Sequence, residues 1–122
     1  MNRIVVIGSC NMDIVVLADK RPTAGETIMG NELHIAHGGK GANQAVAAAR
    51  LGAEVTMVGC IGADAYGQMI LENLKENHIN TDYIVTVPDT TTGTAHITLA
   101  EGDNSIIVIP GANAKVDQSV VD

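Results

Sequence analysis

The chain is 122 residues long, and its 46% hydrophobic and 17% charged residues are typical of a folded globular protein rather than a disordered one. Aspartate and glutamate outnumber lysine and arginine by 14 to 7, and the resulting charge of −7 argues against the basic face that nucleic acids and anionic membranes require. No apolar run reaches the roughly 18 residues of a membrane span, and the first one is too short for a secretory signal, so we expect a cytoplasmic protein without nucleic-acid or membrane partners.

The first third of the chain is predicted to contain three strands. The β-branched run at 4–7, closed by Gly8, is typical of a strand buried on both faces of a parallel sheet. Residues 13–17 form a second short strand. Residues 26–35 alternate weakly, which predicts a half-exposed strand with a bulge at Gly30.

A helix then follows a glycine-rich segment. Residues 38–41 lead into an alanine-rich helix over 42–51, and Gly52 stands where a glycine commonly ends a helix. The inward face of this helix has small side chains, so the helix can lie close against a sheet. A buried strand is predicted at 55–59.

The second predicted helix begins at an N-terminal cap, Asp64, and runs to about residue 77. Met69, Ile70 and Leu74 are expected on its inward face. A further strand over 83–87 ends at Pro88.

After Pro88 the pattern changes to two strands, 94–99 and 105–109, which flank a hairpin turn. Strands that alternate with helices predict right-handed βαβ units and a parallel sheet. Four of the predicted strands have no crossover helix, and we expect them to form a separate, mostly antiparallel sheet. They are the strands at 13–17, 26–35, 94–99 and 105–109. Asp117 is predicted to cap a last helix, and since a domain rarely stops one turn into a helix, we expect an N-terminal part of a longer protein.

The most specific stretch of sequence is Gly-Gly-Lys-Gly-Ala-Asn-Gln-Ala at 38–45. It places backbone N–H groups and one cation at a helix N-terminus, which favours an anion or a hydroxyl-rich ligand. A P-loop is excluded because Gly41 follows Lys40 where a serine or threonine must hold magnesium. A dinucleotide fingerprint is excluded because Gln44 stands where a glycine is needed. A glycine-rich turn without a ligand is the alternative.

A second cluster follows the first predicted buried strand. Asn11 and Asp13 project to the same side of extended backbone, at the strand end where ligands collect in open α/β sheets. Asp13 can accept and Asn11 can donate or accept, which suits a pair of neighbouring hydroxyls. The alternative is a simple Asx turn.

The remaining reactive residue types suggest no metal or nucleophile site. His34 and His37 point to opposite faces of a strand, so they do not make a metal pair. Cys10 and Cys60 are expected to be buried, reduced thiols, because no basic partner stands near either one.

Together these segments resemble the ribokinase branch of the ribokinase/PfkB carbohydrate kinase family. Residues 62–67 are similar to the family's Gly-x-Asp-x-x-Gly turn. The resemblance extends through residues 92–95 and 110–113. The family's gapped N-terminal signature is met across 25 residues by Gly38, Gly39, Gly41, Asn43, Ala45, Gly52 and Gly62.

The resemblance implies a ribokinase-like α/β fold: a Rossmann-like parallel sheet flanked by helices, with a small antiparallel β-sheet inserted as a lid. It implies that 1–122 is the N-terminal part of a single domain. The lid strands are expected within 12–36 and 93–110. The α/β layer is expected to comprise 1–10, 41–87 and the start of a helix at 117–122.

The resemblance also implies ATP-dependent phosphorylation of D-ribose at its 5-hydroxyl, giving ribose 5-phosphate. The lid is implied to form a homodimer contact. The implied substrate-binding residues are Asn11, Asp13, Gly38, Gly39, Lys40, Asn43, Ala95 and Ile97.

One family feature is absent from this sequence. The C-terminal signature Asp-Thr-x-Gly-Ala-Gly-Asp, which supplies the anion hole and the catalytic base, does not occur. We therefore expect no catalytic residue in this chain. We expect ATP, Mg²⁺ and K⁺ to be bound mainly by a half of the protein that this chain lacks, and we expect the fragment alone to be inactive. A deoxyribose or nucleoside kinase of the same family, or a non-catalytic sugar-binding or dimerisation fragment, are the alternatives.

Overall fold

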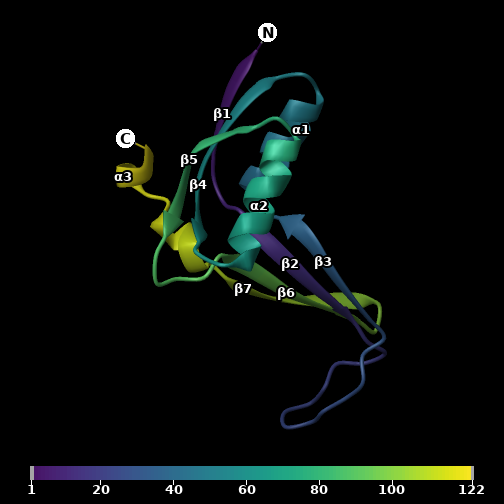
Figure 1. Cartoon of the computed structure of the whole chain (residues 1–122). Helices are drawn as coiled ribbons and strands as arrows, with labels where there is room; N and C mark the ends of the chain where they lie inside the picture. Colours follow the sequence, from purple (N-terminus) through teal and green to yellow (C-terminus); the bar gives the residue numbers. More distant parts are fainter. Residues whose placement is uncertain (1, 122) are drawn as a thin grey trace.

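A computed structural model describes residues 2–121 and contains two sheets. The first is a three-stranded parallel sheet in the order β1-β4-β5, formed by β1 (Arg3–Ile7), β4 (Glu54–Gly62) and β5 (Asn80–Val87). Helices α1 (Lys40–Arg50) and α2 (Ala65–Glu76) lie together on one face of this sheet (Figure 1). The predicted α/β architecture is confirmed.

The second sheet has the order β3-β2-β6-β7 and extends away from the α/β layer (Figure 1). Its two outer pairings are antiparallel, as expected, but the central strands β2 and β6 are parallel. Both central strands continue directly from strands of the parallel sheet, β2 from β1 and β6 from β5, so they leave that sheet in the same direction. The bounds of the strands are Asn11–Leu17 for β2, Glu32–Gly38 for β3, Gly93–Ala100 for β6 and Asp103–Ile109 for β7.

The chain passes four times between the second sheet and the rest of the fold, at the β1–β2, β3–α1, β5–β6 and β7–η1 connections. Each crossing contains or adjoins a glycine. The glycines at the four crossings are Gly8, Gly39, Gly93 and Gly111.

The core lies between the parallel sheet and its two helices. Met57 and Ile61 of β4 are fully buried against Ala45 of α1 and Leu74 of α2. A side chain at Gly41 would meet Gly8, with its Cβ 2.9 Å from the Gly8 Cα. The glycines therefore let the beginning of α1 press directly against the end of β1.

Two burial predictions are wrong. Strand β1 is not buried on both faces, because Val5 is 63% and Ile7 51% exposed. The helices cover only the opposite face of the sheet at this strand. Met69 is exposed rather than inward, because the inward stripe of α2 is Gly67, Ile70 and Leu74, at spacings of three and four.

The predicted strand at 26–35 is also partly wrong, because pairing begins only at Glu32. Residues 18–31 form a long loop, and Gly30 lies in it rather than at a bulge. The Asn31 N–H donates to the Leu17 carbonyl at 2.7 Å, just outside the last β2–β3 pair. Arg21 fastens the loop to the β6–β7 turn by donating to the carbonyls of Ala100 and Asp103.

The β6–β7 hairpin closes through Glu101 and Gly102, both with positive φ angles (57° and 74°), as two-residue hairpin turns favour. A short 3₁₀ helix, η1 (Gly111–Lys115), was not expected from the sequence. Helix α3 (Gln118–Val121) follows Asp117, as predicted. Met1 and Asp122, the outer ends of the predicted layer, lie outside the described residues. Within residues 2–121, no helix combines the length and apolar character that crossing a membrane requires.

Candidate functional site

The site residues predicted on strands share one face of the second sheet. Asn11 pairs with Gly38 on one side and Gly93 on the other, and Asp13 pairs with Ala95 two positions further along. Paired residues lie on the same face of a sheet, and alternate residues of a strand do so too. Asn11, Asp13, Gly38, Ala95 and Ile97 therefore all face the same side.

The carboxylate of Asp13 lies directly over the backbone of Gly38. A Cβ at Gly38 would stand 2.5 Å from Asp13 Oδ2, so only glycine leaves room for this carboxylate. Burial raises the pKa of Asp13 above its ordinary value. No hydrogen bond or ion pair from the described chain reaches its oxygens, which leaves them available to a ligand's hydroxyl donors.

The glycine-rich segment forms the corner between β3 and α1. Gly39 has a φ of 91°, and a Cβ there would stand 2.6 Å from the Ser9 carbonyl oxygen and 3.0 Å from the Asn11 nitrogen. Only glycine therefore allows the start of α1 to lie beside the start of β2. The Ala42 N–H reinforces this contact by donating to the Ser9 carbonyl at 3.0 Å.

Lys40 is the first residue of α1 and is exposed. It stands two residues beyond Gly38, the residue over which the Asp13 carboxylate lies. Among residues 2–121, no acidic side chain forms an ion pair with its ammonium group. The corner therefore brings a cation to the edge of the strand face without neutralising it internally.

Asn43 lies one turn into α1, where its backbone N–H donates to the Gly39 carbonyl at 2.9 Å. It is exposed on α1 and lines a hollow of about 350 Å³ together with His37 and Arg50. No hydrogen bond of the described chain joins it to Asn11 or Asp13. The structure thus places the predicted site residues in two adjoining groups. Asn11, Asp13, Gly38, Ala95 and Ile97 share one face of the second sheet, and Gly39, Lys40 and Asn43 lie at the beginning of α1.

Sequence reasoning assigned no role to Asn113, which contacts Asn11 directly. Asn113 follows β7 and forms hydrogen bonds with Cys10 and with the side chain of Asn11. The two asparagines are 102 residues apart in the sequence, so no periodicity connects them. The only available signal was the presence of Asn113 in the 110–113 segment of the family resemblance.

A second polar group fixes the second sheet to α2. Asp64 Oδ1 caps α2 by accepting from the Gly67 N–H at 2.9 Å, as predicted, and also accepts from the Thr92 hydroxyl at 2.5 Å. Thr92, which is buried, in turn accepts from the Gly62 N–H at 2.9 Å. Burial acts to raise the pKa of Asp64, but the hydrogen bonds from Thr92 and Gly67 outweigh it and hold that pKa below its ordinary value.

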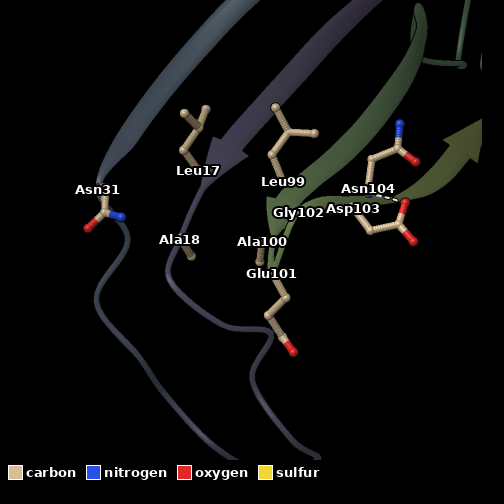
Figure 2. A pocket seen from close by; sticks show the side chains of 9 residues that line it. All are labelled: Leu17, Ala18, Asn31, Leu99, Ala100, Glu101, Gly102, Asp103 and Asn104. Carbon is tan, nitrogen blue, oxygen red and sulfur yellow. Dashed lines mark hydrogen bonds between the residues drawn. The ribbon is translucent and has the colours of Figure 1, made fainter.

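A larger hollow of about 550 Å³ lies at the far tip of the second sheet, where Leu17 ends β2 beside its β6 partner Leu99 (Figure 2). At about 3.3 Å per residue, six residues of β2 place it roughly 20 Å from Asn11. None of the predicted site residues lines it. This hollow is therefore separate from the candidate site.

Both cysteines are buried, as predicted. Burial, with a smaller contribution from the nearby Cys60, raises the pKa of Cys10 to about 12. Burial and the charge of Asp117 raise the pKa of Cys60 as well. Both thiols therefore stay protonated at neutral pH, which makes them poor nucleophiles.

The chain matches the model of the pfkB family carbohydrate kinases over residues 1–121. It is 64% identical, over 113 residues, to the ribokinase of Bacillus subtilis (strain 168), an alignment that covers 93% of this chain and 39% of that relative. The chain thus spans about two fifths of the length of the curated relatives it matches.

Two solved structures carry the same fold. Ribokinase from Giardia lamblia superimposes with a TM-score of 0.90 at 38% identity, covering 99% of this chain and 40% of that one. Arabidopsis thaliana ribokinase, complexed with ribose and ATP, superimposes with a TM-score of 0.86 at 41% identity, covering 92% of this chain and 36% of that one.

Proposed function

This chain belongs to the pfkB family of carbohydrate kinases, and from that membership we propose that it is the sugar-binding part of a cytoplasmic ribokinase. The whole protein would transfer the terminal phosphoryl group of ATP to the 5-hydroxyl of D-ribose, giving ribose 5-phosphate. The relatives of known structure include a ribokinase complexed with ribose and ATP, which supports both substrates.

The observation that carries the proposal is the unpartnered carboxylate of Asp13 above Gly38. A partly buried carboxylate without internal donors favours a ligand that brings its own hydroxyl donors. Asn11 lies on the same face, about 7 Å away along the strand, and adds a second polar group. Together they suit neighbouring hydroxyls of a pentose.

The remaining site residues surround these two groups. Gly38 and Gly39 supply the close backbone approach, and Ala95 and Ile97 of β6 supply an apolar wall for the carbon side of the sugar. Lys40 supplies a positive charge near the sugar. Asn43 is assigned to the sugar site by the family resemblance alone.

This chain does not supply the rest of the chemistry. Within residues 2–121, no group of three or more histidine, cysteine, aspartate or glutamate side chains is placed to hold a metal ion. We assign ATP, Mg²⁺, K⁺ and the catalytic base to the portion of the protein that the relatives have beyond this chain. The 122-residue chain alone is then inactive, because phosphoryl transfer depends on positioning and charge stabilisation by those groups.

We also propose that the second sheet forms a homodimer through the face opposite Asn11. That face carries four apolar side chains that are 45–70% exposed, more than an isolated small sheet tolerates well. They are Leu33, Ile35, Ile107 and Ile109. Sedimentation of the full-length protein tests this proposal. We expect the wild-type protein to be a dimer and the Ile107→Glu variant to be a monomer.

The test of function is a kinase assay on the full-length protein with ATP and, separately, D-ribose, 2-deoxyribose and adenosine. We expect the highest kcat/KM with ribose, and phosphorus NMR should place the product phosphate on the 5-oxygen. A higher kcat/KM with 2-deoxyribose or adenosine would show that the substrate is that compound and not ribose. Saturable ribose binding without any phosphorylation would favour a non-catalytic binding protein instead.

A further inference from the structure

Asn113 is held by backbone groups whose hydrogen-bonding roles are unambiguous. Its Oδ1 accepts from the Cys10 N–H at 2.9 Å, and an N–H can only donate. Its Nδ2 donates to the Cys10 carbonyl at 3.1 Å, and a carbonyl can only accept. The backbone of Cys10 therefore fixes which end of the Asn113 amide is the donor.

This fixed donor determines the orientation of the next amide. Asn113 Nδ2 also donates to Asn11 Oδ1 at 2.6 Å. A reversed Asn11 would place its own NH₂ group against that of Asn113, two donors facing each other. Asn11 therefore turns its oxygen toward Asn113 and its NH₂ group away from it, and no residue of the described chain pairs with that NH₂ group.

The backbone of Gly93 packs against the same pair. A Cβ at this position would overlap Asn113 Nδ2 and stand 2.5 Å from Asn11 Oδ1. Gly93 is also the register partner of Asn11 in β6. The backbone of Gly93 therefore lies directly against both amides, where a side chain would push them apart.

We propose that Asn113 is a positioning residue that makes Asn11 a hydrogen-bond donor toward the sugar. This assignment rests on the proposed function. Asp13 accepts and Asn11 donates, so a hydroxyl between them can donate to Asp13 while it accepts from Asn11. If Asn11 were reversed, two acceptors would compete for one hydroxyl proton, and the sugar would be held less tightly.

The test substitutes Asn113→Asp in the full-length protein. The carboxylate keeps an acceptor for the Cys10 N–H but loses the donor, so Asn11 should turn its NH₂ group toward it. We expect KM for ribose to rise at least tenfold with kcat changed less than threefold, since binding rather than chemistry is affected. Asn104→Asp, an exposed site on β7, adds the same charge and should leave KM unchanged.

A double-mutant cycle separates positioning from general disruption. If Asn113 acts through Asn11, then Asn113→Asp should change KM less than twofold in an Asn11→Ala background. An equal rise in both backgrounds would overturn the proposal, as would an unchanged KM in the single variant.

A measurement on the wild-type protein decides the geometry even if the variant fails to fold. In NMR spectra without ligand, the Gly93 Hα should show a nuclear Overhauser effect to the Asn113 NH₂ and none of comparable strength to the Asn11 NH₂. The reverse pattern would overturn the proposal. Failure of the wild-type protein to phosphorylate ribose would reject the proposed function separately, while this measurement would still decide the orientation.

Discussion

Replacing Asp13 with asparagine should separate binding from stability at the sugar site. The substitution keeps the shape and removes the charge from a carboxylate that no hydrogen bond or ion pair from residues 2–121 reaches. Each charged hydrogen bond to a ligand contributes about 1.5–3 kcal/mol, which corresponds to a rise in ribose KM of about 10- to 150-fold if one such bond is lost. Asp82→Asn, on the exposed side of β5, makes the same charge change and should leave KM unchanged.

The same substitution should not destabilise the protein at neutral pH. Burial raises the pKa of Asp13 above 3.8, so the folded state disfavours the ionised form. This cost is absent at low pH and appears as the pH rises through the window between 3.8 and the raised value. Urea denaturation should therefore show Asp13→Asn equal to wild type below this window and at least as stable as wild type at pH 7.

Ribose binding should carry the opposite pH dependence. Because the ionised carboxylate is the better acceptor, wild-type KM should fall as the pH rises through the titration of Asp13, while KM of Asp13→Asn should stay flat there. An unchanged ribose KM in Asp13→Asn at pH 7 would refute the assignment of Asp13 to the sugar site, whatever the stability data show.

Three further predictions concern the framework. Thr92→Val should lower the free energy of unfolding by about 1–3 kcal/mol in urea titrations, because the buried Gly62 N–H loses its acceptor. An unchanged free energy of unfolding would mean that the hydrogen bonds of the Thr92 hydroxyl with Gly62 and Asp64 are dispensable. Gly39→Ala should lower Tm more than Gly52→Ala, since both have φ above 90° but only the first meets backbone atoms within 4 Å; equal losses would contradict the crowding. Cys10, with its pKa near 12, should resist iodoacetamide at pH 8 until urea unfolds the protein, as mass spectrometry of the modified peptide would show.

Local sequence signals predicted much of this fold. The β-branched run at 4–7, the capping residue Asp64 and the glycine that ends α1 each act within a few residues, so their effects could be read directly. The prediction for β1 failed on burial because hydrophobicity indicates a tendency to be covered, and this chain covers only one face there.

The candidate site was predictable only in part. Asn11 and Asp13 stand on one strand, so alternation alone placed them on the same face. The role of Asn113 depends on its contact with Asn11, which is distant in the sequence, and the role of Gly93 depends on the close approach of its backbone to both amides. Neither contact produces a periodic pattern in the sequence. Residues 26–31 were predicted as part of a strand, because their weak alternation does not reveal that the β2–β3 pairing begins only at Glu32.

The four glycine crossings described above have a mechanical consequence. A sheet that is attached at one end moves least near the attachment and most at its free end. The second sheet is joined to the rest of the fold at the connections that contain or adjoin Gly8, Gly39, Gly93 and Gly111. Asn11 begins β2 beside Gly39 and Gly93, while the β6–β7 turn lies at the far end of the sheet (Figure 1). Any swing of the sheet would therefore carry the outer loops through a wide arc and leave the amide of Asn11 almost stationary.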